Sequence, residues 1–174
     1  MILKILLVIA VSVAAILVFA ATKPDTFHIE RAVVIQAPPD KVFPLIDDLH
    51  NWTRWQPQYS DPAVKLSYSG PDRGVGAESE WSGVGQTGAG RMTVTESEPK
   101  QSVTIAVDWK RPFAVRNINQ FTLAPDGSGT RVTWSMDGPN VYMMKVMSVF
   151  TNMDSMMGKH FEEGLRKLKA AAEK

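Results

Sequence analysis

The sequence offers three histidines and no cysteine for acid–base, nucleophilic or metal chemistry. His28, His50 and His160 are far apart, and none stands in a metal-ligand spacing such as H-E-x-x-H. A Ser-His-Asp triad assembles from distant residues, so spacing does not exclude one, but the chain has no G-x-S-x-G nucleophile elbow. The absence of cysteine removes disulfides, thiolate nucleophiles and cysteine-ligated metals. We therefore predict no catalytic set, no metal site and no cofactor.

An enzyme would need a buried acid or base within a ligand cavity, where it could polarise a carbonyl or move a proton. The polar side chains that could supply that group are Glu80, Glu96, Asp108, Arg116, Tyr142 and His160. Charged residues on strands usually lie on the solvated face of a sheet. The dispersion of these residues along the chain favours binding over catalysis.

Residues 83–88, GVGQTG, match the letters of the dinucleotide-binding fingerprint G-x-G-x-x-G. That fingerprint needs a strand before it and a helix after it, so that the pyrophosphate meets the helix N-terminus. Here the stretch lies between two predicted strands, and we interpret it as a turn.

The strongest pattern in the chain is an apolar stripe near its C-terminus. Apolar residues from Val146 to Leu168 recur three or four residues apart. This spacing predicts one amphipathic helix over residues 141–171, about 45 Å long, with Asn140 as its N-cap.

The composition of that stripe is unusual, because six of the nine methionines fall within residues 143–157. Methionine suits gap filling and adaptable apolar surfaces. The stripe is therefore either ordinary core or, in part, the wall of a cavity for an apolar ligand. Gly158 and Gly164 indicate a bend or a close approach to a neighbouring element.

Upstream of this helix, β-rich runs alternate with turns rich in glycine, proline and aspartate. We predict a strand at residues 28–35, then a helix that starts at residues 37–40, then a short irregular segment. Further strands are predicted at residues 64–69, 77–82, 90–98, 102–109, 115–123 and 130–136, with a turn at 137–140. This order predicts an α+β fold, in which a curved antiparallel sheet of about seven strands wraps on the C-terminal helix. One helix cannot fill such a sheet along its whole length, so the space between them is a candidate pocket.

Alternation along the strands identifies the side chains that would face the helix. Met92, Val94 and Glu96 share one face, and residues 132, 134 and 136 share another. The odd residues from 115 to 123 form a third set, in which two asparagines are the polar exceptions. We predict a ligand site made of Trp81, Met92, Asn119, Phe121 and Trp134 from the sheet, closed by Met147 and Phe150 from the helix. The alternative is that these side chains merely fill the core.

Trp52 and Trp55 complete the predicted ligand-binding residues. They lie on the short irregular segment, close to Pro57 and Tyr59. They could form a mobile rim over the cavity mouth, or lie at a lipid interface, where indoles are favoured. Ordinary packing against the first helix of the domain is the third possibility.

The segment Ile2–Ala21 carries one charge, Lys4. As a helix it would span about 30 Å, the hydrocarbon thickness of a bilayer, which fits a retained anchor. A cleaved signal peptide would have a shorter apolar core and small residues at the cleavage site, and a soluble buried helix is a third possibility. We predict a transmembrane anchor or uncleaved signal at residues 1–21, a linker at 22–26 and a ligand-binding domain at 27–174.

The distribution of charge gives an orientation and excludes one class of partner. Lys4 and the N-terminal amine precede the apolar segment, so the positive-inside rule predicts an extracytoplasmic domain, periplasmic if the protein is bacterial. Without Lys4 the basic and acidic residues balance at 18 each, and no basic stripe indicates a nucleic-acid partner. The oligomeric state is left open.

Three stretches together carry a resemblance: residues 37–43 (APPDKVF), residues 50–57 (HNWTRWQP), and residues 129–135 (GTRVTWS) before a long amphipathic helix. In this order, from about residue 27 to 171, the chain resembles the polyketide cyclase/dehydrase-like branch of the START-like (SRPBCC) superfamily. The resemblance implies a helix-grip fold with a deep cavity between the sheet and the C-terminal helix, and no fixed catalytic set. The superfamily includes lipid-transfer domains, plant allergen-like carriers, cyclases and co-chaperones.

We therefore predict a membrane-anchored protein that binds a hydrophobic small molecule or lipid between sheet and helix, with Asn119 or a similar polar group setting its orientation. Two alternatives stay open. An enzyme of the polyketide cyclase/dehydratase type would use buried polar groups in the same cavity. A protein-partner adaptor would have a collapsed cavity and an exposed apolar patch elsewhere.

Overall fold

The computed structural model describes residues 1–174, except for the side chains of Ser60, Gln86 and Met153. Met153 belongs to the predicted apolar stripe, so this part of the prediction lies outside the described side chains. The chain begins with α1 (Ile2–Ala21), β1 (Thr26–Ile35), α2 (Pro39–Asp47) and the short 3-10 helices η1 (Leu49–Arg54) and η2 (Pro57–Ser60). It continues with β2 (Lys65–Ser69), β3 (Glu78–Ser82), η3 (Gly85–Thr87), β4 (Ala89–Glu98), β5 (Ser102–Arg111), β6 (Val115–Asp126) and β7 (Gly129–Pro139). The chain ends with α3 (Tyr142–Met147) and α4 (Met153–Ala172).

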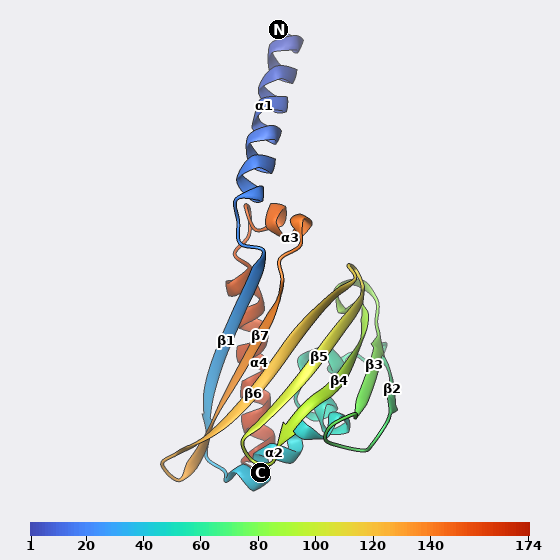
Figure 1. Cartoon of the computed structure of the whole chain (residues 1–174), viewed down its shortest axis with the longest axis vertical. Helices are drawn as coiled ribbons and strands as arrows, with labels where there is room; N and C mark the ends of the chain where they lie inside the picture. The colour runs from blue at the N-terminus through green and yellow to red at the C-terminus, as the bar shows by residue number, and fades with distance from the viewer.

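The seven strands form one antiparallel sheet in the order β1-β7-β6-β5-β4-β3-β2. Consecutive strands are neighbours from β2 to β7, and β1 joins the sheet beside the last strand. The sheet curves around α4, which runs along β1 and β7 (Figure 1). The predicted α+β helix-grip architecture is confirmed, and each predicted strand lies within the observed one or within a residue or so of its ends.

Alternation along β6 separates the two faces of the sheet as predicted. Asn117, Asn119 and Phe121 are buried toward the helix, while Ile118 and Gln120 between them are exposed. A β-strand turns successive side chains to opposite faces, so one hydrophobic face is enough to fix its register.

The prediction for Glu96 is wrong, because a bulge interrupts β4. The pairing of β4 with β5 shifts register between Val94 and Glu96. An extra residue reverses the alternation beyond it, so Glu96 is exposed and accepts a hydrogen bond from Thr104 Oγ1 at 3.1 Å. Ser97 takes the position that faces α2, where its hydroxyl donates to Asp47 Oδ1 at 2.6 Å.

The predicted single C-terminal helix is also wrong, because the chain breaks between α3 and α4. β7 continues to Pro139, so the predicted turn at 137–140 is the end of a strand. The N-cap of α4 is Asn152, whose side chain accepts from the N–H of Ser155 at 3.1 Å.

The break between α3 and α4 has a local cause. Ser148 Oγ donates to Lys145 O at 2.8 Å, and Thr151 Oγ1 donates to Met147 O at 3.0 Å. Hydroxyl side chains that bond nearby carbonyls compete with helical hydrogen bonds, and β-branched residues such as Val149 and Thr151 are weak helix formers.

The two tryptophans after α2 hold its C-terminal end. Trp52 Nε1 donates to Ile46 O at 2.9 Å, and Trp55 Nε1 donates to Leu45 O at 2.8 Å. These carbonyls belong to the last turn of α2 and have no partner within the helix. Both indoles are almost completely buried. The mobile-rim and lipid-interface predictions for this pair are therefore wrong, and packing against α2 is what the structure shows.

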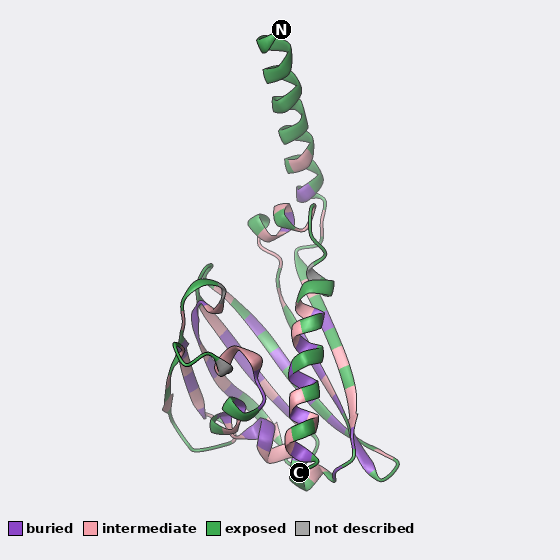
Figure 2. Cartoon of the chain, turned by 180° about the vertical axis from the view of Figure 1, so that it is seen from behind, coloured by how far each residue is buried: buried purple, intermediate pink, exposed green. Residues whose placement is uncertain are grey.

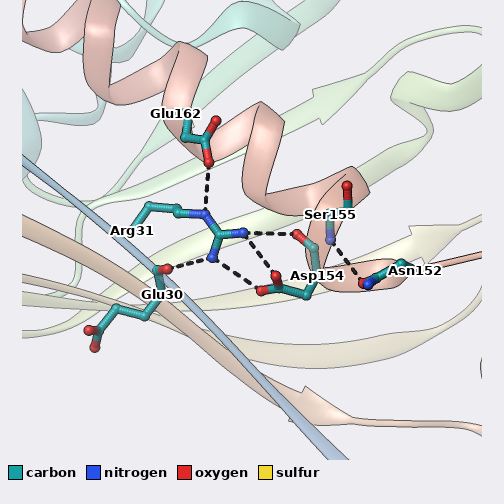
Figure 3. A network of polar contacts seen from close by, with 6 residues as sticks. All are labelled: Glu30, Arg31, Asn152, Asp154, Ser155 and Glu162. Atoms are coloured by element: carbon teal, nitrogen blue, oxygen red, sulfur yellow. Dashed lines mark hydrogen bonds and ion pairs between the residues drawn. The ribbon is translucent and has the colours of Figure 1, made fainter.

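Arg31 of β1 fastens the first turns of α4 to the sheet (Figure 3). Its guanidinium donates to Asp154 Oδ2 at 2.9 Å and to Glu162 Oε1 at 2.9 Å. A Cβ on Gly158 would lie 2.0 Å from Arg31 Nη2, so only glycine leaves room for this side chain between strand and helix. Gly164 does the same for Trp134, whose ring would lie 2.9 Å from an added Cβ. Both glycines mark close approaches, as predicted.

The helix α1 projects from the domain and is exposed along almost its whole length (Figure 2). Only its last residues meet the rest of the chain, and Ala20 is fully buried there. The interpretation of this segment as a buried helix of a soluble core is therefore wrong.

Candidate functional site

A cavity of about 500 Å³ lies between the sheet and the N-terminal half of α4. Its lining comes from the segment that holds η1 and η2, from η3, from strands β3 to β7 and from α4: Trp52, Gln56, Pro57, Gln58, Trp81, Thr87, Met92, Val107, Trp109, Asn119, Trp134, Met136, Met156, Met157, His160 and Phe161. Most of these side chains are aromatic or methionine. The cavity is therefore an apolar space with few polar groups, as ligand pockets usually are.

The cavity has an aromatic wall at each end. At one end Trp81 and Trp109 meet edge to face, with ring centroids 5.0 Å apart. Gly90 permits this, since an added Cβ would lie 2.4 Å from the Trp81 ring. At the other end Trp134 stacks on Phe161, with centroids 3.9 Å apart and ring planes 6° apart. Such ring pairs contribute about 0.5–1.5 kcal/mol beyond the burial of their surface.

Five of the lining side chains are polar: Gln56, Gln58, Thr87, Asn119 and His160. Asn119 Oδ1 accepts from Trp134 Nε1 at 3.3 Å. Gln56 is buried, and its Oε1 has no hydrogen-bond partner among the described residues. Burial lowers the pKa of His160 below its ordinary value near 6.5, so its imidazole is neutral at neutral pH. An unpartnered buried acceptor destabilises a protein by about 1–3 kcal/mol unless something bonds to it.

The structure brings together five of the nine predicted ligand-binding residues. Trp52, Trp81, Met92, Asn119 and Trp134 line the cavity. Phe121 and Trp55 lie one layer behind it, where Phe121 contacts the rings of Trp52, Trp55 and Trp134. These two residues build the wall and are not exposed on it.

Met147 and Phe150 are not among the residues that line this cavity. They are 50 and 71 % exposed, and they belong to α3 and to the turn after it. The helix break carries both residues away from the sheet. Phe150 instead borders a second, more polar cavity of about 540 Å³, lined by Lys23, Ser148, Val149, Phe150, Thr151, Asn152 and Asp154.

Among the residues considered for acid–base chemistry, His160 alone lines the cavity. Glu80 lies on the outer face, where Arg91 and Lys110 hold the pKa of its carboxyl below the ordinary range. Asp108 pairs with Arg116 at 3.7 Å on the same outer face. The side chains that the structure describes include no cluster of three or more His, Cys, Asp or Glu that could hold a metal ion.

The predicted site left out eleven of the sixteen lining residues, and Trp109, Gln56 and Thr87 show why. Trp109 shares a face with Val107 and could have been found by the alternation along β5. Gln56 lies between two short 3-10 helices and Thr87 ends a third, and such short segments have no periodicity that indicates the direction of a side chain.

A curved antiparallel sheet that grips a C-terminal helix over an apolar cavity defines the helix-grip class of proteins. A family described as "Polyketide cyclase / dehydrase and lipid transport" matches residues 26–173. The chain belongs to this family, which lies within the SRPBCC superfamily, and family and fold together suggest a domain that binds a hydrophobic ligand. A comparison with curated proteins gave no match.

Solved structures confirm the fold at low sequence identity. Protein CV1439 from Chromobacterium violaceum is 18% identical, with a TM-score of 0.61 over 87% of this chain and 99% of that one. Major latex-like protein 151 from Panax ginseng is 15% identical, with a TM-score of 0.63 over 84% and 97%. A protein from Thermus thermophilus, TTHA0849, is 18% identical, with a TM-score of 0.62 over 84% and 97%.

Outside the family match, α1 is long and apolar enough to cross a membrane, with 20 residues and a mean hydropathy of 3.0.

Proposed function

We propose that this protein is a membrane-anchored carrier that holds a hydrophobic small molecule or lipid in the cavity between the sheet and α4. The observation that supports this function best is a cavity of about 500 Å³ walled by tryptophan and methionine. Its volume falls among those of ordinary ligand pockets, roughly 300–1,000 Å³. An apolar ligand that buries about 300 Å² there would gain about 7 kcal/mol before the unfavourable entropy of binding.

The polar groups of the cavity favour a ligand with a hydroxyl or another hydrogen-bond donor at one end. Gln56 Oε1 is a buried acceptor without a partner among the described residues. This oxygen has almost no exposed surface and lies toward Gly164 of α4, so a ligand donor would reach it only after the Gln56 side chain turned, and would then remove its unfavourable desolvation. Neutral His160 and Asn119 lie on the same lining and can orient the polar end. The apolar body of the ligand would then contact the aromatic and methionine walls.

Binding is favoured over the two alternatives by the cavity itself. A cyclase or dehydratase needs groups that exchange protons with the substrate, and His160 is the sole titratable side chain in the described lining. An adaptor would have a collapsed cavity, whereas this one is open.

The anchor function of α1 is supported by its contacts with the domain. Tyr142 Oη donates to Leu17 O at 3.0 Å, and Ala20 is buried against the region of α3. A cleaved signal peptide would make no such contacts in the mature protein. The mass of the mature chain from membranes distinguishes the two: an intact residue 1–21 segment supports an anchor, and its loss contradicts one.

Photocrosslinking tests the carrier function. A fatty acid with a diazirine on its chain is added to membranes that contain the full-length protein, and crosslinked residues are mapped by mass spectrometry. We expect crosslinks at Trp109, Met156 and Met157, which line the cavity. Val107→Trp, which fills the cavity from β5, should abolish them, while Gln120→Trp on the exposed face of β6 should not. Crosslinks confined to α1 and α3, or equal in both variants, would contradict a carrier.

A further inference from the structure

One end of the sheet gathers four segments that are far apart in the sequence. β1 begins at Thr26 opposite Pro139, the last residue of β7, so α1 and α3 leave the sheet side by side. The turn between β5 and β6 and the loop between β3 and β4 lie at the same end, since Ala89 pairs with both Arg111 and Ser82. In Figure 1 the start of β1, the end of β7 and α3 lie beneath α1, and the tip of β5 and β6 lies to one side of them.

The linker between α1 and the sheet is held against α3. Lys23 Nζ donates to Ser148 O at 2.8 Å, and the N–H of Asn140 donates to Asp25 O at 2.7 Å. Lys145 donates to Asp25, and this bond holds the pKa of the Asp25 carboxyl below its ordinary range. With the Tyr142–Leu17 bond, these contacts fix the position of α3 relative to the end of α1.

The free surface of α3 is largely apolar, and the turn after it exposes Phe150 beside the polar residues Thr151 and Asn152. Met143, Met147 and Phe150 are 53, 50 and 71 % exposed. The one charged residue of α3, Lys145, turns inward, and its side chain is only 8 % exposed. A short surface helix in water usually exposes its charged residues and buries its apolar ones, and α3 does the opposite.

The contact between Tyr142 and α1 limits how far this surface can lie from the membrane, and α3 itself lies just beyond the end of α1 (Figure 1). Leu17 lies four residues before the end of α1 at Ala21, or about 6 Å along the helix axis. Interfacial helices bury their apolar face roughly 5–10 Å into the boundary between headgroups and acyl chains.

We infer that α3 and the turn 148–152 lie in the lipid interface of the membrane that α1 crosses, so that the cavity end of the domain faces the bilayer. The inference rests on the proposed anchor. The occupant of this surface is lipid, because α3 is tied to the end of α1 and its one charge, on Lys145, is buried against the exposed carboxylate of Asp25. Phe113 and Val84 are exposed in two loops at the same end of the sheet.

This placement implies that the ligand enters the cavity from the membrane. The lining residues Thr87, Trp109 and Met136 lie near the strand ends that face the membrane, and Met156, 61 % exposed, lies in the first turns of α4. A molecule leaving the bilayer would reach the cavity at the end where the domain already touches the lipid. The ligand class is therefore a membrane-soluble molecule exchanged directly with the bilayer.

The absence of cysteine makes the depth measurable. Single-cysteine variants Met143→Cys, Met147→Cys and Phe150→Cys of the full chain are labelled with an environment-sensitive fluorophore and reconstituted in phosphatidylcholine and phosphatidylglycerol liposomes. Brominated lipids quench labels that lie among acyl chains. Ser128→Cys, in the turn at the opposite end of the sheet, and Gln120→Cys, on its exposed face, are the controls. We expect quenching of roughly twofold or more at the three test positions and none at the controls.

Flotation of the same liposomes separates the two ways of failing. Protein that does not float contradicts the anchor, and the inference with it. Protein that floats with unquenched labels at all three positions leaves the anchor standing and overturns the interfacial placement. Equal quenching at test and control positions would also overturn it, because the label rather than the protein would then be entering the lipid.

Discussion

The two ends of the space between the sheet and α4 differ in how completely they are filled. Around Phe121 the rings of Trp52, Trp55 and Trp134 interlock, and Leu165 and Leu168 complete a region without exposed apolar surface. Beyond Trp134 the same sheet and helix enclose about 500 Å³ of open space. The same two elements therefore build a packed core at one end and a cavity at the other.

The difference follows from what holds α4 at each end. Near the packed end Gly164 lets the helix lie directly on the Trp134 ring. Near the open end Arg31 ties the helix to β1, at the edge of the sheet, while β3 to β5 curve away from it. The packed half and the open half are thus separate parts of one core, and a change in one half need not affect the other.

The largest expected effect comes from truncating one ring in each half. Phe121→Ala should lower the free energy of unfolding by about 3–5 kcal/mol, because it opens a void among packed rings. Trp109→Ala removes a larger ring but only widens an existing cavity, so we expect about 1–2 kcal/mol. Urea unfolding of the full chain in detergent, followed by circular dichroism, measures both. A greater loss from Trp109→Ala would contradict the division of the core.

A smaller effect on stability is expected from Gly158→Ala, and its sign should depend on whether Arg31 is present. Gly158→Ala should destabilise the protein although alanine is the better helix former, since the new methyl group displaces the Arg31 guanidinium. In an Arg31→Ala background the same substitution should stabilise it by about 1 kcal/mol, the difference in helix propensity. Thermal unfolding of the four proteins measures this cycle, and an effect of one sign in both backgrounds would count against the steric explanation.

The smallest expected effect is a pH dependence from His160 in the open half. Burial lowers its pKa in the folded protein below the ordinary value near 6.5, so the unfolded chain binds a proton first as the pH falls. The stability contributed by this group is therefore full above about pH 6.5 and is lost as the pH falls from there toward the folded pKa. Chemical unfolding at several pH values should show this decline in the wild type and not in His160→Gln. Identical profiles would contradict a buried neutral imidazole.

Sequence patterns predicted the sheet well, because alternation with period two is a strong signal on strands with one buried face. The set Asn117, Asn119 and Phe121 was read correctly from this alternation. The same reasoning failed at Glu96, where a bulge adds one residue and nothing in the local sequence indicates it.

The helices were predicted less well, because competing local bonds decide where a helix stops. An apolar stripe runs through residues 146–168, yet Ser148, Thr151 and Asn152 bond to nearby backbone groups and break it. This break moved Met147 and Phe150 out of the predicted site and to the end of α1. The roles of Trp52 and Trp55 depended on carbonyls of α2 that only the folded chain brings within reach.

The central claim is that the open half of the core holds an apolar molecule, and native mass spectrometry of the full chain released from its own membranes tests it most directly. We predict a protein peak with a bound mass of one small apolar molecule, lost in Val107→Trp and kept in Gln120→Trp. A wild-type protein that carries no bound mass under gentle release, or one whose bound mass survives filling of the cavity, would contradict the claim.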